Sequence, residues 1–274
     1  MKIKPPSLFS NLLLAGFCFV TCLTFGKVKP RIAQTEPQTL EWTVAGVIRK
    51  ALVYIPASAK TKPTPIIFAY HGHGGTMQHM YNGRRFDKLW PEAIFICPQG
   101  LKTVGALTDP EGKLPGWQMA ADTSNSDLKF FDAMLQTLKK DYKIDDKRIY
   151  VTGHSNGGGF TYLLWAMRGD VFAAVAPSSA VAAKLMPLLK PKPALHIMGE
   201  TDPLVKPTWQ RMTCNYLLKL NKCQQTGQKI SEYATEYPSV IGTPFVWYLH
   251  PGGHVYPNEA DAVVIDFFKK QVKP

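Results

Sequence analysis

Five consecutive residues, Gly153-His154-Ser155-Asn156-Gly157, hold a serine in the pattern Gly-x-Ser-x-Gly. A β-branched and aromatic run at 148–152 precedes them and predicts a strand, and an apolar run at 160–167 follows and predicts a helix. Such a strand–turn–helix forces the serine into a strained backbone conformation that exposes its hydroxyl, and small residues must flank it because strand and helix nearly touch. A chance match is the alternative, but the flanking elements favour a nucleophile elbow with Ser155 as nucleophile.

A serine nucleophile needs a base, and the base needs an acid that orients it. In an elbow-type fold these follow the serine in the order acid, then histidine. His254 lies in a glycine-flanked loop after a predicted strand and is the preferred base; His250 ends that strand, and His196 lies inside another strand, where a core role is favoured. Asp202 follows a strand by a few residues and is the preferred acid, with Glu200 as the alternative.

The oxyanion of an acyl-transfer reaction needs two main-chain N–H donors. Asn156, the residue after the nucleophile, is expected to supply one. The glycine-rich segment His71-Gly72-His73-Gly74-Gly75 follows an early apolar strand, and we expect His73 to supply the second, with Gly74 as the alternative. His71 and His73 could also suggest a metal, but no third ligand stands at suitable spacing, so we expect no metal and no cofactor.

The remaining pattern indicates a mostly parallel α/β sheet with helices on both faces. Ser126 is expected to cap a helix over 126–142. Residues 101–117, rich in glycine and proline, are expected to be a loop that forms a functional rim. The other predicted elements are strands at 40–44, 48–55, 66–70, 94–97, 172–175, 194–198 and 245–249, and helices at 208–220 and 260–269.

Residues 1–26 resemble a secretory signal peptide, with Lys2 and Lys4 before an uncharged run at 8–25. An uncleaved membrane anchor is the alternative, and a lipoprotein is disfavoured because neither Cys18 nor Cys22 follows a small residue. We expect a disordered lead-in at 27–37 and a single domain at 38–274. The protein would then be secreted or periplasmic, without stable membrane insertion after cleavage.

Loss of Lys2 and Lys4 with the leader lowers the net charge from +12 to +10. The lysines are scattered and are not interleaved with aromatic residues, so nucleic-acid binding is not expected.

Of the remaining cysteines, Cys97 lies in an apolar strand and is expected to be buried. Cys214 and Cys223 flank a helical stretch, and a disulfide between them stays open from sequence.

Together these segments resemble secreted α/β-hydrolases of the feruloyl esterase and polyhydroxybutyrate depolymerase group. The resemblance rests on six segments that occur along the chain in the same order as in the family: 71–75, Gly116-Trp117, Asp127, 153–158, 201–203 and 252–257. It implies an α/β-hydrolase fold with Ser155 as nucleophile, His254 as base and Asp202 as its partner. Tyr256 stands where the family usually has tryptophan. The chain has no room for the extra domain that polymer depolymerases often carry, which favours soluble esters.

The sequence therefore predicts an exported serine carboxylic ester hydrolase that works through an acyl-enzyme. Its substrates would be soluble esters, such as feruloyl or acetyl esters of plant polysaccharide. A polyhydroxyalkanoate depolymerase or oligomer hydrolase is the first alternative, followed by a peptidase or acyltransferase, and a non-catalytic binding protein of the same fold is the alternative from another class. Trp117, Tyr81 and Trp209 are candidates for lining an acyl pocket, or are packed rim aromatics.

Overall fold

The computed structural model describes residues 36–274. The predicted signal peptide and most of the predicted lead-in lie outside the described residues. The described residues belong to one compact unit, and the first strand begins at Gln38. None of the helices within 36–274 is long and apolar enough to cross a membrane.

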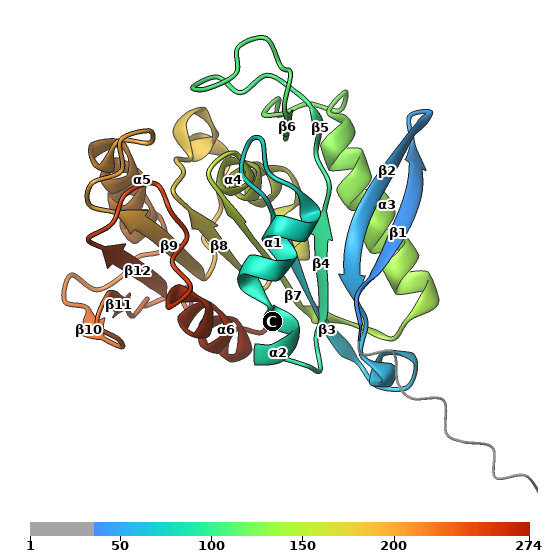
Figure 1. The fold of residues 1–274 in the computed structure, drawn as a ribbon. Helices are drawn as coiled ribbons and strands as arrows, with labels where there is room; N and C mark the ends of the chain where they lie inside the picture. The colour runs from blue at the N-terminus through green and yellow to red at the C-terminus, as the bar shows by residue number, and fades with distance from the viewer. Residues whose placement is uncertain (1–35) are drawn as a thin grey trace, which may run out of the picture. The chain divides into compact units, whose positions relative to one another are not determined.

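A ten-stranded sheet runs through this unit in the order β1-β2-β4-β3-β7-β8-β9-β12-β11-β10 (Figure 1). The six strands from β4 to β12 are mutually parallel, and antiparallel strands extend the sheet at both edges. The strands are β1 (Gln38–Val44), β2 (Val47–Tyr54), β3 (Thr64–Tyr70), β4 (Ile94–Pro98), β7 (Ile144–His154), β8 (Ala174–Ser178), β9 (Ala194–Gly199), β10 (Gln228–Lys229), β11 (Ala234–Tyr237) and β12 (Phe245–His250). The predicted mostly parallel sheet is confirmed.

Helices cover both faces of this sheet, because successive side chains of a strand point to opposite faces. On β3, Ile66, Phe68 and Tyr70 join one core cluster, whereas Ile67 and Ala69 join the other. The first cluster includes side chains of α3 (Ser126–Asp141), α4 (Asn156–Arg168) and α5 (Pro207–Leu220). The second includes side chains of α1 (Met77–Arg84), α2 (Phe86–Leu89) and α6 (Ala260–Lys270).

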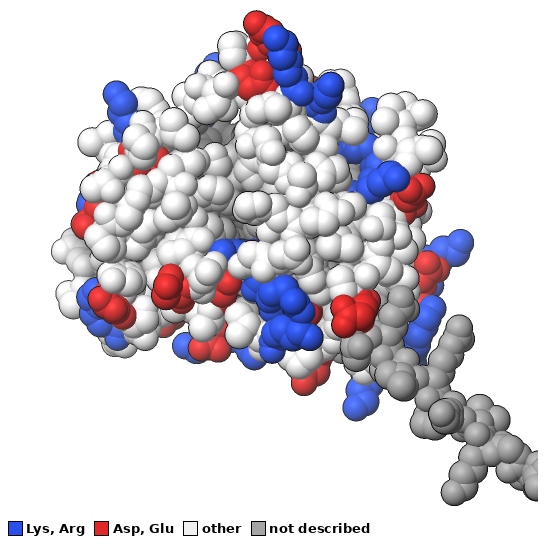
Figure 2. Space-filling model, in the orientation of Figure 1, with Lys and Arg blue, Asp and Glu red and all other residues white. Residues whose placement is uncertain are grey.

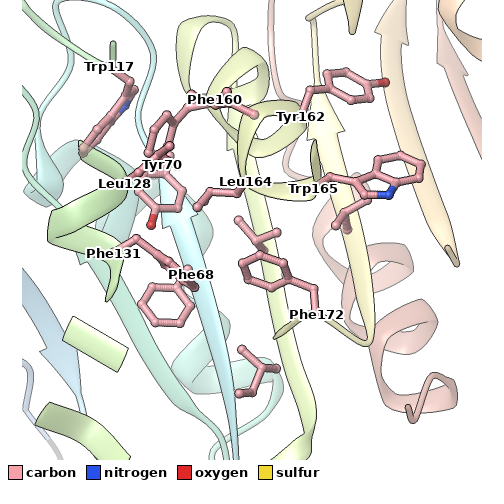
Figure 3. Packing of buried hydrophobic residues seen from close by; sticks show 14 of the residues in the cluster. Phe68, Tyr70, Trp117, Leu128, Phe131, Phe160, Tyr162, Leu164, Trp165 and Phe172 are labelled. Atoms are coloured by element: carbon pink, nitrogen blue, oxygen red, sulfur yellow. The ribbon is translucent and has the colours of Figure 1, made fainter. Parts of the chain in front are cut away.

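The first cluster is rich in aromatic rings that pack between β3 and the helices behind it (Figure 3). Phe68 meets Phe131 of α3 edge-on at 5.0 Å between ring centroids, and Tyr70 meets Phe160 of α4 at 4.9 Å. Through these contacts α4, the helix that follows Ser155, packs tightly against the end of β3. Ser155 is thus positioned by regular elements on both sides.

Several predicted boundaries move by one or two residues. The helix α3 is capped by Asn125 rather than by Ser126, because the Asn125 side chain accepts hydrogen bonds from the N–H groups of Asp127 and Leu128. Strand β8 begins at Ala174 rather than at Phe172, since a short 3-10 turn, Gly169–Val171, precedes it. Cys97, Cys214 and Cys223 are all free thiols, so the structure has no Cys214–Cys223 disulfide.

The segment expected to be a loop at 101–117 is a β-ribbon. Its two short strands, β5 (Leu101–Lys102) and β6 (Pro115–Gly116), pair in antiparallel fashion and lift the connecting residues 103–114 above the sheet. The ribbon stands at the carboxyl ends of the parallel strands, at the top of the view in Figure 1. It therefore forms part of the rim over the site at that edge of the sheet.

Candidate active site

Ser155 occupies a sharp turn between β7, which ends at His154, and α4, which begins at Asn156. Its φ is 56° and its ψ is −118°, a backbone conformation that a non-glycine residue adopts only under constraint. A Cβ at Gly153 would overlap the main chain of Gly157, and one at Gly157 would overlap the carbonyls of Tyr70 and His71. The glycines are therefore required by the close approach of strand and helix, as the sequence predicted.

The structure brings Ser155, His254 and Asp202 together. Nε2 of His254 lies 2.8 Å from Oγ of Ser155, and Nδ1 of His254 lies 2.9 and 3.1 Å from the two oxygens of Asp202. Because an ionised carboxylate only accepts hydrogen bonds, Nδ1 carries the hydrogen, and Nε2 of the neutral ring accepts from the serine hydroxyl. This arrangement can remove the hydroxyl proton during attack on a carbonyl carbon.

Asp202 is 3% exposed and is held by several donors besides His254. Its Oδ1 accepts hydrogen bonds from the N–H groups of Leu204 and Val205, each at 2.9 Å. Such donors stabilise the charged carboxylate in a buried position. The alternative residues lie elsewhere: Glu200 is near Arg211 on the surface, and Nδ1 of His250 accepts a hydrogen bond from Gly252 N–H.

A buried chain of hydrogen bonds extends from Asp202 into the core. Gln210 donates from Nε2 to Oδ2 of Asp202 at 3.1 Å and to the carbonyl of Val205 at 2.7 Å, so its Oε1 must be the acceptor for Nε2–H of His196 at 3.1 Å. His196 Nδ1 is then the acceptor for the Tyr162 hydroxyl, at 2.7 Å. Burial lowers the pKa of His196 to about 4, which fits a neutral ring.

These buried partners escaped the sequence analysis. His196 fits the core role expected for it, but Gln210 and Tyr162 carry no local signal beyond helical spacing. Only the fold brings α5, β9 and α4 together around them. A polar residue on the buried face of a predicted helix, such as Gln210 in 208–220, is the one signal that could have marked them.

The glycine-rich segment 71–75 lies against the elbow, because a Cβ at Gly72 would stand 3.5 Å from Cβ of Ser155. Gly74 has a φ of +77°, and its N–H donates to the carbonyl of Pro115 at 2.7 Å. That bond removes Gly74 as a free donor. The main-chain N–H groups of His73 and Asn156 have no acceptor within residues 36–274.

The His73 side chain ties this segment to the rim. Its Nε2 lies 3.0 Å from Oδ2 of Asp109, which also accepts from the N–H of Leu114 at 2.8 Å. The hydrogen bond from His73, followed by that from Leu114, lowers the pKa of Asp109 to about 2. Asp109 therefore stays ionised, and its hydrogen bond with His73 holds the ribbon tip, residues 103–114, above the elbow.

Trp117 and Tyr81 are packed aromatics, which is the alternative that the sequence left open for them. Trp117 is fully buried, where its indole N–H donates to the carbonyl of His71 at 2.8 Å and its main chain makes two hydrogen bonds with the Asn156 side chain. It braces the elbow against the segment 71–75. Tyr81 is 2% exposed and stacks on Phe95 on the opposite face of the sheet. Both rings are buried by tertiary packing.

A cavity of about 790 Å³ opens beside Ser155 and Asn156. The ribbon tip, the segment after β6 and the segment 180–183 contribute its walls, which are mostly apolar. Trp209 is the one predicted aromatic that lines it, and this residue is 42% exposed. We call this the first cavity; its size suits an organic group of several ring atoms.

A second cavity of about 500 Å³ lies on the other side of His73, next to His254. Figure 2, which has the orientation of Figure 1, shows a hollow near the middle of this face. The walls come from the glycine-rich segment, from one side of α1 and from the loop after β12, with His79, Arg84 and Tyr256 among the lining residues. His154 also faces it; burial, followed by the nearby His254, lowers the pKa of His154 to about 3.

Among residues 36–274 no group of three histidine, cysteine or acidic side chains is arranged to hold a metal. Both ring nitrogens of His71 are engaged by the main chain: Nδ1 lies 2.7 Å from the carbonyl of Gly72, and Nε2 accepts from the N–H of Gly100 at 3.0 Å. Burial lowers the pKa of His71 to about 4. The His71 ring thus holds the segment 71–75 in place through hydrogen bonds, and neither of its nitrogens is free to bind a metal.

Comparison with known proteins finds one matching family model and several relatives in sequence. A family model described as the prolyl oligopeptidase family matches residues 117–202, which include the elbow. Feruloyl esterase C of Emericella nidulans is 29% identical over 71% of this chain and 71% of its own length. Feruloyl esterase D of Neurospora crassa is 26% identical over 82% of this chain and 79% of its own length.

The structure of an acetyl xylan esterase from Aspergillus awamori superposes with a TM-score of 0.66 at 15% identity. The match covers 85% of this chain and 99% of that one, so the two share a fold across almost the whole described unit. The chain therefore has an α/β-hydrolase fold and is similar in sequence to feruloyl esterases.

Proposed function

We propose that the protein is a serine carboxylic ester hydrolase that works through an acyl-enzyme. Ser155 Oγ attacks the ester carbonyl while its proton passes to Nε2 of His254, and Asp202 stabilises the resulting imidazolium. The N–H groups of His73 and Asn156 hold the oxyanion. The observation that carries the proposal is the contact of Ser155 with His254 at 2.8 Å beside a large cavity.

We further propose that the acyl group is a cinnamic acid such as ferulate. The first cavity is mostly apolar, and the exposed Trp209 gives an aromatic acid a surface for stacking. An acetyl group would leave most of the 790 Å³ filled only with water. The relatives named feruloyl esterase support the same acyl class. We propose feruloyl esters of plant polysaccharide as the natural substrates.

The leader predicted at 1–26 supports export, which would bring the enzyme to polymeric plant material. Export is tested by cell fractionation of two forms of the protein, the full chain and a chain that lacks residues 1–26. Recovery of the full chain outside the cytoplasm, with the leader removed, is the expected result. Retention of both forms in the cytoplasm would contradict export without touching the chemistry.

Hydrolysis of methyl ferulate by wild type and by Ser155→Ala tests the esterase assignment. Removing the nucleophile should lower kcat by several orders of magnitude, on the order of 10⁴-fold or more. Ser58→Ala, far along the chain in a short 3-10 turn, is the matched control and should keep wild-type rates. Equal rates for wild type and Ser155→Ala would exclude the mechanism.

A peptidase is the second candidate, because the prolyl oligopeptidase model covers 117–202. The same variants decide between the two when an aminoacyl-aryl amide is offered beside methyl ferulate. An esterase cleaves the ester far faster than the amide, whereas a peptidase shows comparable rates on both. Cleavage of neither would favour a hydrolase-fold binding protein without catalysis.

A further inference from the structure

The edge of the sheet opposite the candidate site forms a surface of its own. The six parallel strands begin at this edge, and β1 begins there too because it runs in the same direction as β4. The helices that connect parallel strands run back to the same edge and end there. We call this surface the amino face; it lies at the bottom of the view in Figure 1. It consists of residues 36–37, 55–63, 88–93, 139–148, 168–173, 189–193, 219–227, 238–244 and 269–274.

The basic residues of the chain are concentrated on the amino face. It carries sixteen lysines and arginines and six aspartates and glutamates, whereas the rest of residues 36–274 carries eleven and fourteen. Twelve of the sixteen bases are exposed, and the other four are half-buried. In Figure 2 charged side chains gather along the lower edge of the molecule, and the middle of the view is almost free of them. Such an imbalance attracts anions to one side of the protein.

Helix ends explain only part of this concentration. The last turns of α3, α4 and α6 hold lysine or arginine, and cations there stabilise the negative end of the helix dipole. The segments that lead into β3 and β9 have no α-helix dipole to complement. Yet 55–63 and 189–193 each hold two lysines and no acid. Helix stabilisation therefore does not account for the whole amino face.

Exposed apolar side chains lie among these bases. Val240 is 72% exposed and Val272 is 56% exposed, and Leu89 and Ile241 are exposed as well. Cations beside aliphatic groups suit the boundary of a lipid layer, where the cations contact phosphate and the aliphatic groups enter the acyl region. An acidic polysaccharide would gain from the lysines but not from the valines. The mixture therefore favours lipid.

The segment before β1 has the same positive character. Residues 27–35 hold Lys27, Lys29 and Arg31 and no acid. The chain passes from them into β1, which begins at the amino face at Gln38. In the sequence they follow the predicted leader, whose uncharged run is the part of a secretory signal that enters a membrane. The chain thus carries basic residues both on the amino face and in the segment that leads to it.

We propose that the amino face docks on an anionic phospholipid surface. Exposed lysines contact the phosphate groups, and Val240 and Val272 enter the headgroup layer. The residues that line the two cavities beside Ser155 and His254 all lie outside the amino face, so docking leaves the candidate site open. The proposal does not depend on the proposed function, because docking requires no catalysis.

Co-sedimentation of residues 27–274 with vesicles tests the docking. Residues 1–26 are left out because their uncharged run would bind any membrane, and the compact unit that holds the sheet and both core clusters is kept whole. The protein should bind vesicles with about 30% phosphatidylglycerol in phosphatidylcholine, and about 0.5 M salt should release it. It should not bind vesicles of phosphatidylcholine alone.

Three exposed lysines of the amino face serve as the test variant, because their side chains make no hydrogen bond or ion pair within residues 36–274. They are changed together, as Lys62→Gln, Lys140→Gln and Lys143→Gln. At roughly a fivefold loss for each lysine, binding to the anionic vesicles should weaken by about a hundredfold.

The matched control removes the same charge from exposed lysines toward the opposite edge, as Lys102→Gln, Lys129→Gln and Lys184→Gln together. This variant should keep most of the binding. Val240→Ser should weaken vesicle binding severalfold, whereas Ile48→Ser, in the exposed hairpin between β1 and β2, should not. Thermal unfolding checks that each variant is folded.

Equal losses in the two triple variants, or no loss in the amino-face variant, would overturn the proposal. Binding to polygalacturonate but not to the anionic vesicles would assign the face to an acidic polysaccharide instead. Hydrogen exchange tests the orientation: on vesicles, exchange should slow at 139–148 and stay unchanged in the ribbon at 101–117. Slowing in the ribbon alone would contradict docking through the amino face.

Discussion

Gln210 donates a hydrogen bond from Nε2 to Oδ2 of Asp202 across 3.1 Å, fully inside the protein. The amide thereby links the carboxylate at the candidate site to His196 and Tyr162 in the core. Because its second N–H is bound to the carbonyl of Val205, Gln210 cannot turn without losing both bonds. Gln210 therefore fixes the orientation of the Asp202 carboxylate, and the carboxylate in turn orients the His254 ring.

Replacement of Gln210 by leucine should lower kcat. A hydrogen bond to a charged group contributes about 1.5–3 kcal/mol, so loss of positioning is expected to lower kcat about tenfold or more. KM for methyl ferulate should stay near that of wild type, because Gln210 lines neither cavity. Asn215→Leu, an exposed amide on the same helix, is the matched control. A kcat equal to wild type, or a change in KM alone, would contradict a positioning role.

Two buried tyrosines should respond oppositely to loss of the hydroxyl. The Tyr162 hydroxyl donates to His196, so Tyr162→Phe leaves a buried acceptor unpaired and should lower the free energy of unfolding by about 1–3 kcal/mol. The Tyr70 hydroxyl is buried without a partner in residues 36–274, so Tyr70→Phe should be neutral or stabilising. Urea denaturation of both variants measures the difference. Equal destabilisation would contradict the hydrogen-bond assignment.

Stability should fall as the pH is lowered from 7 to 5. Burial lowers the pKa of His196 to about 4, below the usual value near 6.5, so the unfolded chain binds a proton in this range that the folded protein excludes. The contribution of His196 is present above pH 6.5 and is lost as the pH falls toward 4. From pH 7 to pH 5 this one group should remove about 2 kcal/mol of unfolding free energy.

His196→Gln checks the assignment, because it removes the titrating ring. The loss of unfolding free energy between pH 7 and pH 5 should be smaller than in wild type by about 2 kcal/mol. Leu195→Val, a neighbouring core change that keeps every imidazole, should lower stability equally at both pH values. A pH dependence in His196→Gln as steep as in wild type would show that the ring is protonated in the folded protein.

The contact of His73 with Asp109 should matter for both substrate binding and turnover. Asp109→Ala releases the ribbon tip, which lines the first cavity, and frees the side chain of the residue proposed as an oxyanion donor. We expect kcat/KM for methyl ferulate to fall about tenfold, a loss typical of slight misplacement in an active site. Glu111→Ala, an exposed acid on the same tip, is the control and should retain wild-type values. A fall in both variants would argue against a specific role of Asp109.

The sequence predicted the elements whose signal is local. The elbow was recognisable because strand, small residues and helix follow one another within about twenty positions, and the parallel strands are continuous apolar runs. His254 and Asp202 followed from chain order and from their places after strands. The structure brings all three together at hydrogen-bonding distances.

Other features depend on contacts between distant segments. Helix α1 was missed because Met77–Arg84 contains Asn82 and Gly83 and has few apolar residues, so its helical signal is weak. The ribbon at 101–117 pairs only two residues on each side, too few for strand periodicity. The sequence leaves two roles open for Trp117, a pocket wall or a packed aromatic, and in the structure Phe160 and Tyr70 pack against its ring. Nothing near residue 117 in the sequence reveals that enclosure.

The central claim is that Ser155 carries the acyl group, and mass spectrometry of a quenched reaction tests it directly. Trypsin cleavage after Arg148 and Arg168 isolates residues 149–168, which contain Ser155. Wild type mixed briefly with an activated aryl ferulate should yield this peptide heavier by one feruloyl group, attached at Ser155, and Ser155→Ala should yield it unmodified. Full turnover with an unmodified 149–168 peptide, or a feruloyl group on any other residue, would contradict the claim.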